Sequence, residues 1–200
     1  MLQNLRASAA MLLAFTLLTG LVYPLAVTGI AWVMAHEGAL GSLVVKDGKV
    51  IGSSLIGQSF TSDKYFHPRP SATSAADPTD PTKTIDAPYN AASSSGSNFG
   101  PLTAKLIDRV KSDVAALRAQ DVSGPIPVDA VTTSSSGLDP DISPEAALLQ
   151  VPRVAKARAL REDRIRSLVA SQTEGRALGL LGEPHVNVLS LNLALDDLTH

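Results

Sequence analysis

The residues most able to do chemistry are a run of serines and four scattered histidines. Ser134, Ser135 and Ser136 could supply the nucleophilic hydroxyl of a hydrolase. Such a serine needs a base held beside it, and neither a G-x-S-x-G motif nor a neighbouring base accompanies this run. An anchored or secreted hydrolase with a distant base stays open as an alternative. No catalytic constellation is predicted.

Motifs for metals and nucleotides are equally weak. The carboxylates of Asp139 and Asp141 lack the glycine and the downstream glutamate of a calcium loop. Gly48-Lys49 lacks the upstream glycine and the following hydroxyl residue of a P-loop. The histidines have no ligand-like spacing; they are His36, His67, His185 and His200. The sequence therefore predicts no metal site and no cofactor bound directly.

Composition excludes further classes of function. The chain has 200 residues and no cysteine, which rules out thiol catalysis, disulfides and cysteine-ligated zinc. The net charge is −2, the pI is about 6.1, and no basic stripe alternates with aromatic residues. We therefore expect no nucleic-acid partner.

One apolar stretch, residues 7–35, is the element around which the chain is organised. It holds no Asp, Glu, Lys or Arg, and roughly 20 apolar helical residues cross a bilayer core of about 30 Å. Arg6 and Trp32 lie where interfacial anchors are expected. A cleaved signal peptide is the alternative, because Val33-Met34-Ala35 is an acceptable cleavage site. A signal core of about 7–15 residues is much shorter than this stretch, so we predict a retained transmembrane helix.

Small and hydroxyl side chains recur along this predicted helix. They are Thr16, Gly20, Tyr23, Pro24 and Thr28, with Thr19 beside them. Small residues on one face let a second membrane helix approach closely, so we predict packing against a partner helix. Pro24 should also kink the helix and leave the Gly20 carbonyl without its usual donor.

The predicted fold is α+β: a single N-terminal transmembrane helix followed by one mixed α/β extracytoplasmic domain. Residues 1–6 form a short cytoplasmic N-terminus, and residues 36–200 form the domain. Arg6 on one side is nearly balanced by Lys46 and Lys49 on the other. A short N-terminus before a long domain favours an internal N-terminus and an exported domain.

Local patterns predict the elements of the domain. Asp47-Gly48 between apolar runs indicates a β-hairpin, with a possible extension over residues 53–56. Helices are expected over residues 98–120, with Pro101 in the first turn, and from an N-cap at Ser143 onward. Breaks in the second helical stretch are expected at residues 151–152 and near Leu160. Strands are expected over residues 128–133 and 186–193.

Residues 66–100 form a long loop rich in proline and serine, without hydrophobic periodicity. Tyr65, Phe66 and Tyr89 lie beside prolines at its ends. Exposed aromatic residues on rigid turns are typical of interface anchors, so we predict that these rings dock on a partner. A loop folded back on its own domain is the alternative.

Several blocks of sequence together resemble a known family, the C subunit of the Kdp potassium-transporting P-type ATPase. The blocks are residues 20–25, 52–58, 65–72, 88–90, 95–98, 131–139, 142–147, 150–158, 182–188 and 191–196. They run from the anchor to near the C-terminus in the family's order. Small departures occur at Ser94-Ser95, where the family often has glycine, and at Ala159, where glycine or asparagine is usual.

The resemblance implies a non-catalytic, single-pass subunit in a bacterial inner membrane. Its implied partners are a channel-like potassium-binding subunit and an ATP-hydrolysing P-type subunit, which handle K⁺ and ATP. It also implies a catalytic chaperone that raises the pump subunit's ATP affinity, with a nucleotide contact at Gln150. An exported domain would not meet cytoplasmic ATP, so the predicted topology argues against that contact. A membrane-anchored ligand-binding module unrelated to transport is the alternative function.

Overall fold

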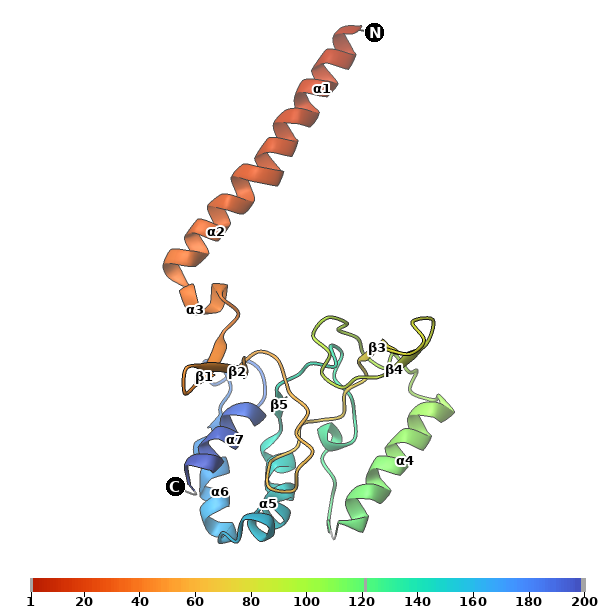
Figure 1. Ribbon diagram of the computed structural model, residues 1–200, viewed down its shortest axis with the longest axis vertical. Coiled ribbons are helices and arrows are strands. Elements are labelled where there is room, and N and C mark those ends of the chain that lie inside the picture. Colours follow the sequence, from red (N-terminus) through yellow and green to blue (C-terminus); the bar gives the residue numbers. More distant parts are fainter. Residues whose placement is uncertain (1, 121, 199–200) are drawn as a thin grey trace. The chain divides into compact units, whose positions relative to one another are not determined.

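The computed structural model describes residues 2–120 and 122–198. It divides into two compact units, Met1–Ile51 and Gly52–His200, and Figure 1 shows the elements of each.

The first unit begins with one uninterrupted helical run. It comprises α1 (Leu2–Leu17), the π turn η1 (Leu18–Val22) and α2 (Tyr23–Met34). Residues Asn4–Met34 have a mean hydropathy of 2.0 over their most apolar window, and none of that window is buried. This helix is long and apolar enough to cross a membrane, as the sequence predicts.

The π turn lies where Pro24 disturbs the helix. The N–H of Tyr23 donates to the Leu18 carbonyl, five residues back, while the Thr19 hydroxyl donates to the Phe15 carbonyl at 2.7 Å. Because proline has no N–H to donate, the helix accommodates one extra residue in the preceding turn. The disturbance expected at Pro24 thus takes the form of a π turn.

A short helix and a hairpin complete this unit. The helix α3 (His36–Ala39) leads to the two-stranded sheet of β1 (Leu43–Lys46) and β2 (Lys49–Ser53). Asp47 and Gly48 both have positive φ, 51° and 74°, as a two-residue hairpin turn with the correct twist requires. The predicted hairpin is confirmed. Its expected extension is limited to a single bridge between Ser53 and Ile56.

The second unit packs three helices against a small antiparallel sheet. The helices are α5 (Pro144–Arg158), α6 (Glu162–Ser171) and α7 (Val188–Asp197). The strands are β5 (Asp141–Ile142), β6 (Thr173–Glu174) and β7 (His185–Asn187), in the order β5-β7-β6. Apolar side chains between these elements form the core: Phe66, Ile142, Ala146, Ala147, Val151, Val154, Ala155, Ile165, Val169, Val186, Val188, Leu191 and Leu195.

Helix α5 begins as predicted and ends later than expected. The Ser143 hydroxyl accepts from the Ala146 N–H at 3.1 Å, so the predicted N-cap is confirmed. The predicted break at residues 151–152 is wrong, because α5 continues through Pro152. Val151 and Val154 are fully buried, and their packing outweighs the missing backbone bond.

The expected break near Leu160 is confirmed. Ala159 ends α5 in the left-handed region, with φ 53°. Glycine or asparagine adopts this conformation with less strain than alanine.

The strand predicted over residues 186–193 is wrong beyond Asn187. The Asn187 side chain accepts from the Ser190 N–H at 3.1 Å and caps α7. Buried side chains then recur with helical spacing, at Val188, Leu189, Leu191, Asn192 and Leu195. A dense run of Val and Leu fits both a buried strand and a buried helix, and the cap decides between them.

The middle of the chain is more ordered than its composition predicts. Residues 66–100 contain an antiparallel hairpin of β3 (Ser74–Ala76) and β4 (Thr84–Asp86). The next helix, α4 (Ala104–Ala119), begins after Thr103, so the expected start near Pro101 is wrong. The strand expected over residues 128–133 is instead a single 3₁₀ turn, η2 (Val128–Ala130).

The aromatic residues of the predicted docking loop have partners inside their own unit. Phe66 is completely buried in the core, so the expectation that its ring is exposed for docking is wrong. The Tyr65 hydroxyl donates to Asp196 at 3.2 Å, and the Arg158 guanidinium lies 4.8 Å from the centre of its ring. The Tyr89 hydroxyl donates to the Arg69 carbonyl at 2.6 Å. Docking through Tyr65 and Tyr89 stays a prediction.

The Phe66→Ala substitution should therefore destabilise the protein itself. Removing a buried phenylalanine ring typically costs about 3–5 kcal/mol of unfolding free energy. Denaturant unfolding of the full chain in detergent measures this loss. Phe99→Ala, at a ring that is 39% exposed, is the matched control and should cost much less. Equal losses from the two substitutions would show that Phe66 is not a core residue.

Candidate functional site

Two side-chain amides hold the backbone of Phe66 and His67, and we call this arrangement the amide clamp. Asn192 on α7 accepts from the Phe66 N–H at 2.8 Å and donates to the Phe66 carbonyl at 3.0 Å. Gln150 on α5 does the same for His67, at 2.7 and 3.0 Å. Each amide thus forms, for one residue of an extended segment, the pair of backbone hydrogen bonds that a neighbouring β-strand would otherwise form.

Arg153 completes the clamp one turn of α5 beyond Gln150. Its guanidinium donates to the Gln150 side-chain oxygen at 2.7 Å and to the backbone carbonyls of Tyr65 and Asp63 at 3.0 and 2.9 Å. The Gln150 nitrogen also donates to the Ala146 carbonyl at 3.3 Å. Both polar atoms of the Gln150 side chain therefore have two partners within the protein.

The surroundings of His67 lower the pKa of its imidazole. Burial is the largest cause and the positive charge of Arg153 adds to it, while the hydrogen bond to the Ser62 carbonyl and the charge of Asp63 oppose the shift. Its Nε2 atom lies 3.0 Å from the Ser62 carbonyl and 3.3 Å from the Arg153 guanidinium. A protonated Nε2 would donate to the carbonyl, and an unprotonated one would accept from Arg153, so the tautomer of His67 decides which of the two hydrogen bonds forms.

A cavity of about 350 Å³ borders the clamp. His67, Gln150 and Arg153 line one part of it, and Leu117 and Gln120 at the end of α4 line another. The clamp side chains point their polar atoms at backbone groups of the 63–67 segment. The resemblance implies a nucleotide contact at Gln150, and in the structure both polar atoms of this side chain are hydrogen-bonded within the domain.

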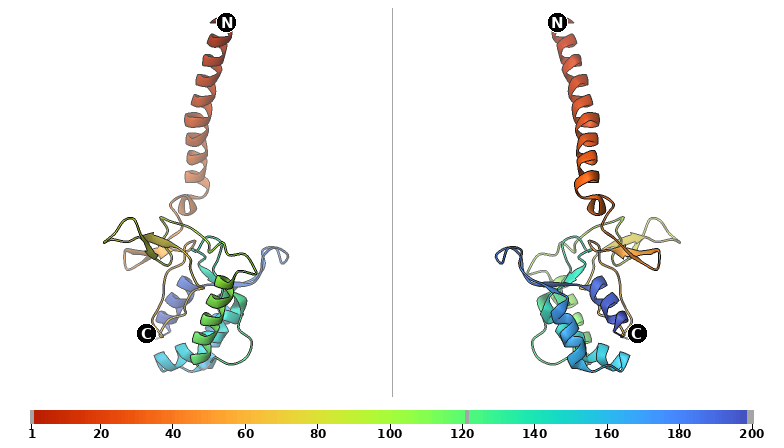
Figure 2. Two further views of the ribbon diagram at one scale, coloured as in Figure 1. Left: turned by 90° about the vertical axis from the view of Figure 1, so that its right-hand side faces the viewer. Right: turned by 90° about the vertical axis from the view of Figure 1, so that its left-hand side faces the viewer.

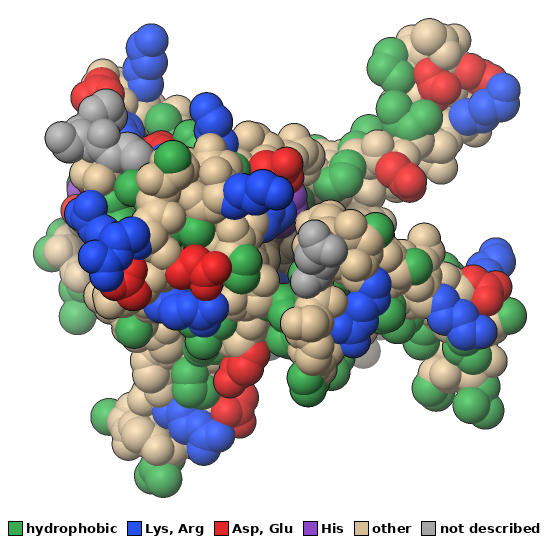
Figure 3. Space-filling model, turned by 90° about the horizontal axis from the view of Figure 1, so that it is seen from below, with side chains coloured by type: hydrophobic (Ala, Val, Ile, Leu, Met, Phe, Trp, Pro, Cys, Tyr) green, Lys and Arg blue, Asp and Glu red, His purple; other side chains and the backbone are tan. Residues whose placement is uncertain are grey.

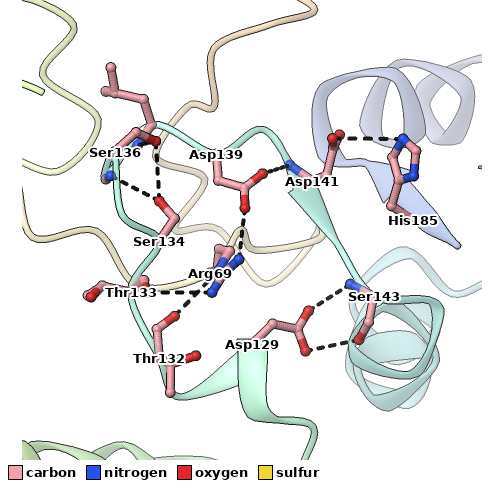
Figure 4. A network of polar contacts seen from close by, with 12 residues as sticks. Arg69, Asp129, Thr132, Thr133, Ser134, Ser136, Asp139, Asp141, Ser143 and His185 are labelled. Carbon is pink, nitrogen blue, oxygen red and sulfur yellow. Dashed lines mark hydrogen bonds and ion pairs between the residues drawn. The ribbon is translucent and has the colours of Figure 1, made fainter. Parts of the chain in front are cut away.

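A second polar network joins the loops beside the sheet (Figure 4). The Arg69 guanidinium pairs with Asp139 at 2.8 Å and reaches the carbonyls of Thr132 and Thr133 at 3.4 and 3.5 Å. Asp129 accepts from both the N–H and the hydroxyl of Ser143, at 2.6 and 2.9 Å. These contacts connect the loop after Phe66 with the start of α5.

The serines predicted as a possible nucleophile belong to the turn in this network. The Ser134 hydroxyl accepts from the Gly137 N–H at 2.9 Å, and the Ser136 hydroxyl accepts from the Leu138 N–H at 3.1 Å. Gly137 has φ 67°, and an added Cβ would lie 2.6 Å from the Ser95 carbonyl oxygen. These hydroxyls shape a tight turn, and Figure 4 shows His185 beside Asp141, away from them.

His185 lies between two carboxylates on neighbouring strands. Its Nε2 atom is 3.9 Å from Asp141 on β5 and 3.8 Å from Glu174 on β6. Burial raises the pKa of Asp141, an effect that His185 opposes. Across residues 2–120 and 122–198, no group of three or more His, Asp or Glu side chains could hold a metal ion. His36 stacks edge-on against Trp32, and His200 lies outside the described residues.

Sequence reasoning missed Asn192 and Arg153. Asn192 falls within the run interpreted as a strand, so its place on the buried face of a helix was hidden. An asparagine that is only 2% exposed needs hydrogen-bond partners, and these come from Phe66, far away in sequence. Only the correct helical phase of residues 188–197 would have indicated that this amide points inward.

Within the described residues, the fold defines a class of protein in which one apolar helix is long enough to span a membrane and is followed by an α+β domain. The polar networks of this domain bind its own loops. The chain belongs to the KdpC family. The model of this family, described as "K+-transporting ATPase, c chain", matches residues 5–197.

Curated relatives agree over the full chain. The potassium-transporting ATPase KdpC subunit of Methylobacterium nodulans is 66% identical over 99% of this chain and 98% of its own. Those of Rhodopseudomonas palustris (strain BisB5) and Bradyrhizobium diazoefficiens are 65% and 63% identical, over 100% and 98% of this chain and 99% and 98% of their own lengths. Membership in this family confirms the resemblance seen in the sequence.

The amide clamp predicts the effect of Gln150→Leu. This substitution leaves the N–H and carbonyl of His67 without their partners, and each unsatisfied buried group costs about 1–3 kcal/mol. The free energy of unfolding of the full chain should fall accordingly. Gln120→Leu, at an exposed glutamine directly after α4, is the matched control and should leave stability nearly unchanged. A Gln150→Leu protein as stable as wild type would contradict the structural role.

Proposed function

We propose that this chain is a non-catalytic accessory subunit of a high-affinity, ATP-driven potassium import complex. In this proposal it stabilises the assembly of the channel-like and ATP-hydrolysing subunits. The observation that carries the proposal is the helix Asn4–Met34, whose most apolar stretch is not buried by any other part of the described chain. Such a helix needs lipid and other helices to cover it, and membership in the c-chain family supplies the complex.

The anchor has a face suited to a partner helix. A regular helix turns by about 100° per residue, so Thr28 would lie roughly 120° around the helix axis from Thr16. The extra residue of the π turn reduces this angle by about 100°. The two threonines then lie within roughly 20° of each other. An added Cβ at Gly20 meets no atom of the chain within 4 Å. This geometry supports a shared face for Thr16, Pro24 and Thr28, from which Tyr23 lies roughly 120° away.

The proposed orientation places the N-terminus inside and the domain outside the bacterial inner membrane. ATP would then lie on the opposite side of the membrane from Gln150, whose amide is already fully hydrogen-bonded. Any increase in the pump subunit's ATP affinity would have to act through that subunit's conformation, by way of the anchor helix or the domain surface.

The Gly20→Leu substitution tests the partner-helix face. A leucine side chain there should hold the partner helix away and lower co-purification of the complex about tenfold, with poorer growth at low K⁺. Gly29→Leu is the matched control, because Gly29 is also open but lies about 100° around the helix from Thr28. If both variants co-purify like wild type, packing through this face is wrong.

The absence of cysteine allows a direct test of orientation. Leu102→Cys, at a side chain that is 91% exposed, should react with a membrane-impermeant maleimide on intact spheroplasts. Asn4→Cys should react only after the membrane is permeabilised. The reverse pattern would place the domain in the cytoplasm and overturn the proposed orientation.

A further inference from the structure

The hairpin between β6 and β7 carries leucines that nothing in its unit covers. In both views of Figure 2 this segment projects away from the helices. Leu178, Leu180 and Leu181 are 92%, 82% and 65% exposed. Isolated exposed leucines are common, but these three lie within one turn, and a local concentration of exposed apolar side chains is typical of interaction sites. We call residues 177–181 the leucine tip.

The tip is held in shape by its own backbone. Ala177 and Leu181 exchange hydrogen bonds at 2.9 and 3.0 Å, and the Leu180 N–H donates to the Ala177 carbonyl at 3.1 Å. Leu178 and Gly179 both have positive φ, 54° and 73°. Leucine is disfavoured in this region, so the turn keeps an apolar side chain at its apex against the local conformational preference.

Below the tip the surface becomes acidic. Arg176 and Glu183 form an ion pair across the hairpin at 2.5 Å. Two further carboxylates, Glu174 and Asp141, lie on either side of His185. A groove of about 940 Å³ lies here, lined by Ala177, Leu181 and Pro184 and by these carboxylates. Arg69 also lines it, but its guanidinium is paired with Asp139, and acidic side chains outnumber basic ones in the lining. Elsewhere, Figure 3 shows basic and acidic side chains interspersed over the face that it presents.

Area and charge select among possible occupants of this surface. A stable homodimer buries about 800 Å² per partner, far more than three leucine side chains offer, so the contact suits a partner that is already held nearby. Acidic side chains beside the leucines would be repelled by anionic lipid headgroups. They would instead pair with lysine or arginine side chains.

We propose that the leucine tip inserts into an apolar pocket with a basic rim on another subunit of the same transporter, with the acidic groove facing that rim. This inference rests on the proposed accessory function and adds the place and chemistry of one contact. The anchor would bring the chain to the complex, and the tip would fix the domain on its partner.

The test is a triple variant of the full chain with Leu178→Ser, Leu180→Ser and Leu181→Ser. This variant is co-expressed with the other transporter subunits. We expect the amount of complex that survives detergent washing to fall at least tenfold. The melting temperature of the variant alone should be unchanged, because the replaced side chains are exposed. Leu102→Ser is the matched control, since Leu102 is as exposed as Leu178.

Photo-crosslinking from a benzophenone side chain in place of Leu180 identifies the occupant. A crosslink to another transporter subunit supports the proposal. A crosslink to a second copy of this chain, to lipid, or to nothing overturns it. If wild type co-purifies and the triple variant does so equally, the tip proposal fails while the accessory function stands. If wild type itself does not co-purify, the accessory function fails and the tip proposal falls with it.

Discussion

The second unit depends on the amide clamp, which allows an extended segment without strand partners to lie inside a helical core. A buried backbone N–H or carbonyl must be hydrogen-bonded, and residues 65–67 belong to no strand. Asn192 and Gln150 bind four such groups of Phe66 and His67 from two different helices. With these groups satisfied, the Phe66 ring can enter the core at no cost in unpaired polar atoms. The clamp thereby fixes α5 and α7 to the same segment.

From the clamp, further polar contacts order the loops in turn. Arg69 lies just beyond His67 and pairs with Asp139, and the loop around Asp139 leads into the Asp129–Ser143 contact at the start of α5. Charged hydrogen bonds of this kind are stronger than neutral ones and restrict orientation. The polar side chains of Gln150, Asn192 and Arg69 thus form hydrogen bonds and ion pairs within the domain. The anchor helix and the projecting hairpin are among the surfaces that expose apolar side chains to other molecules.

The sequence was informative where one local interaction decides the structure. Asp47-Gly48 predicts its hairpin because few residues accept positive φ, and Ser143-Pro144 predicts a helix start because the cap is local. The strand predicted over residues 186–193 was wrong because a dense apolar run fits a strand or a helix equally well, and only the cap at Asn187 decides for helix α7. The docking prediction for Phe66 was wrong because the residues that surround it are distant in sequence: Asn192, which binds its backbone, is 126 positions away, and the bond from His67 to Gln150 spans 83. A proline-rich composition does not reveal such distant partners.

These constraints limit how an accessory chain of this kind can influence ATP binding. A side chain that is saturated by internal bonds contributes no new contact to a nucleotide, so an effect on affinity must come from preferring one conformation of the pump subunit. Coupling between two binding events is reciprocal. If this chain tightens ATP binding by some factor, ATP must tighten the binding of this chain by the same factor. The proposed packing at the anchor would provide such a route, because two conformations of a partner helix need only differ in how well they fit the face around Gly20.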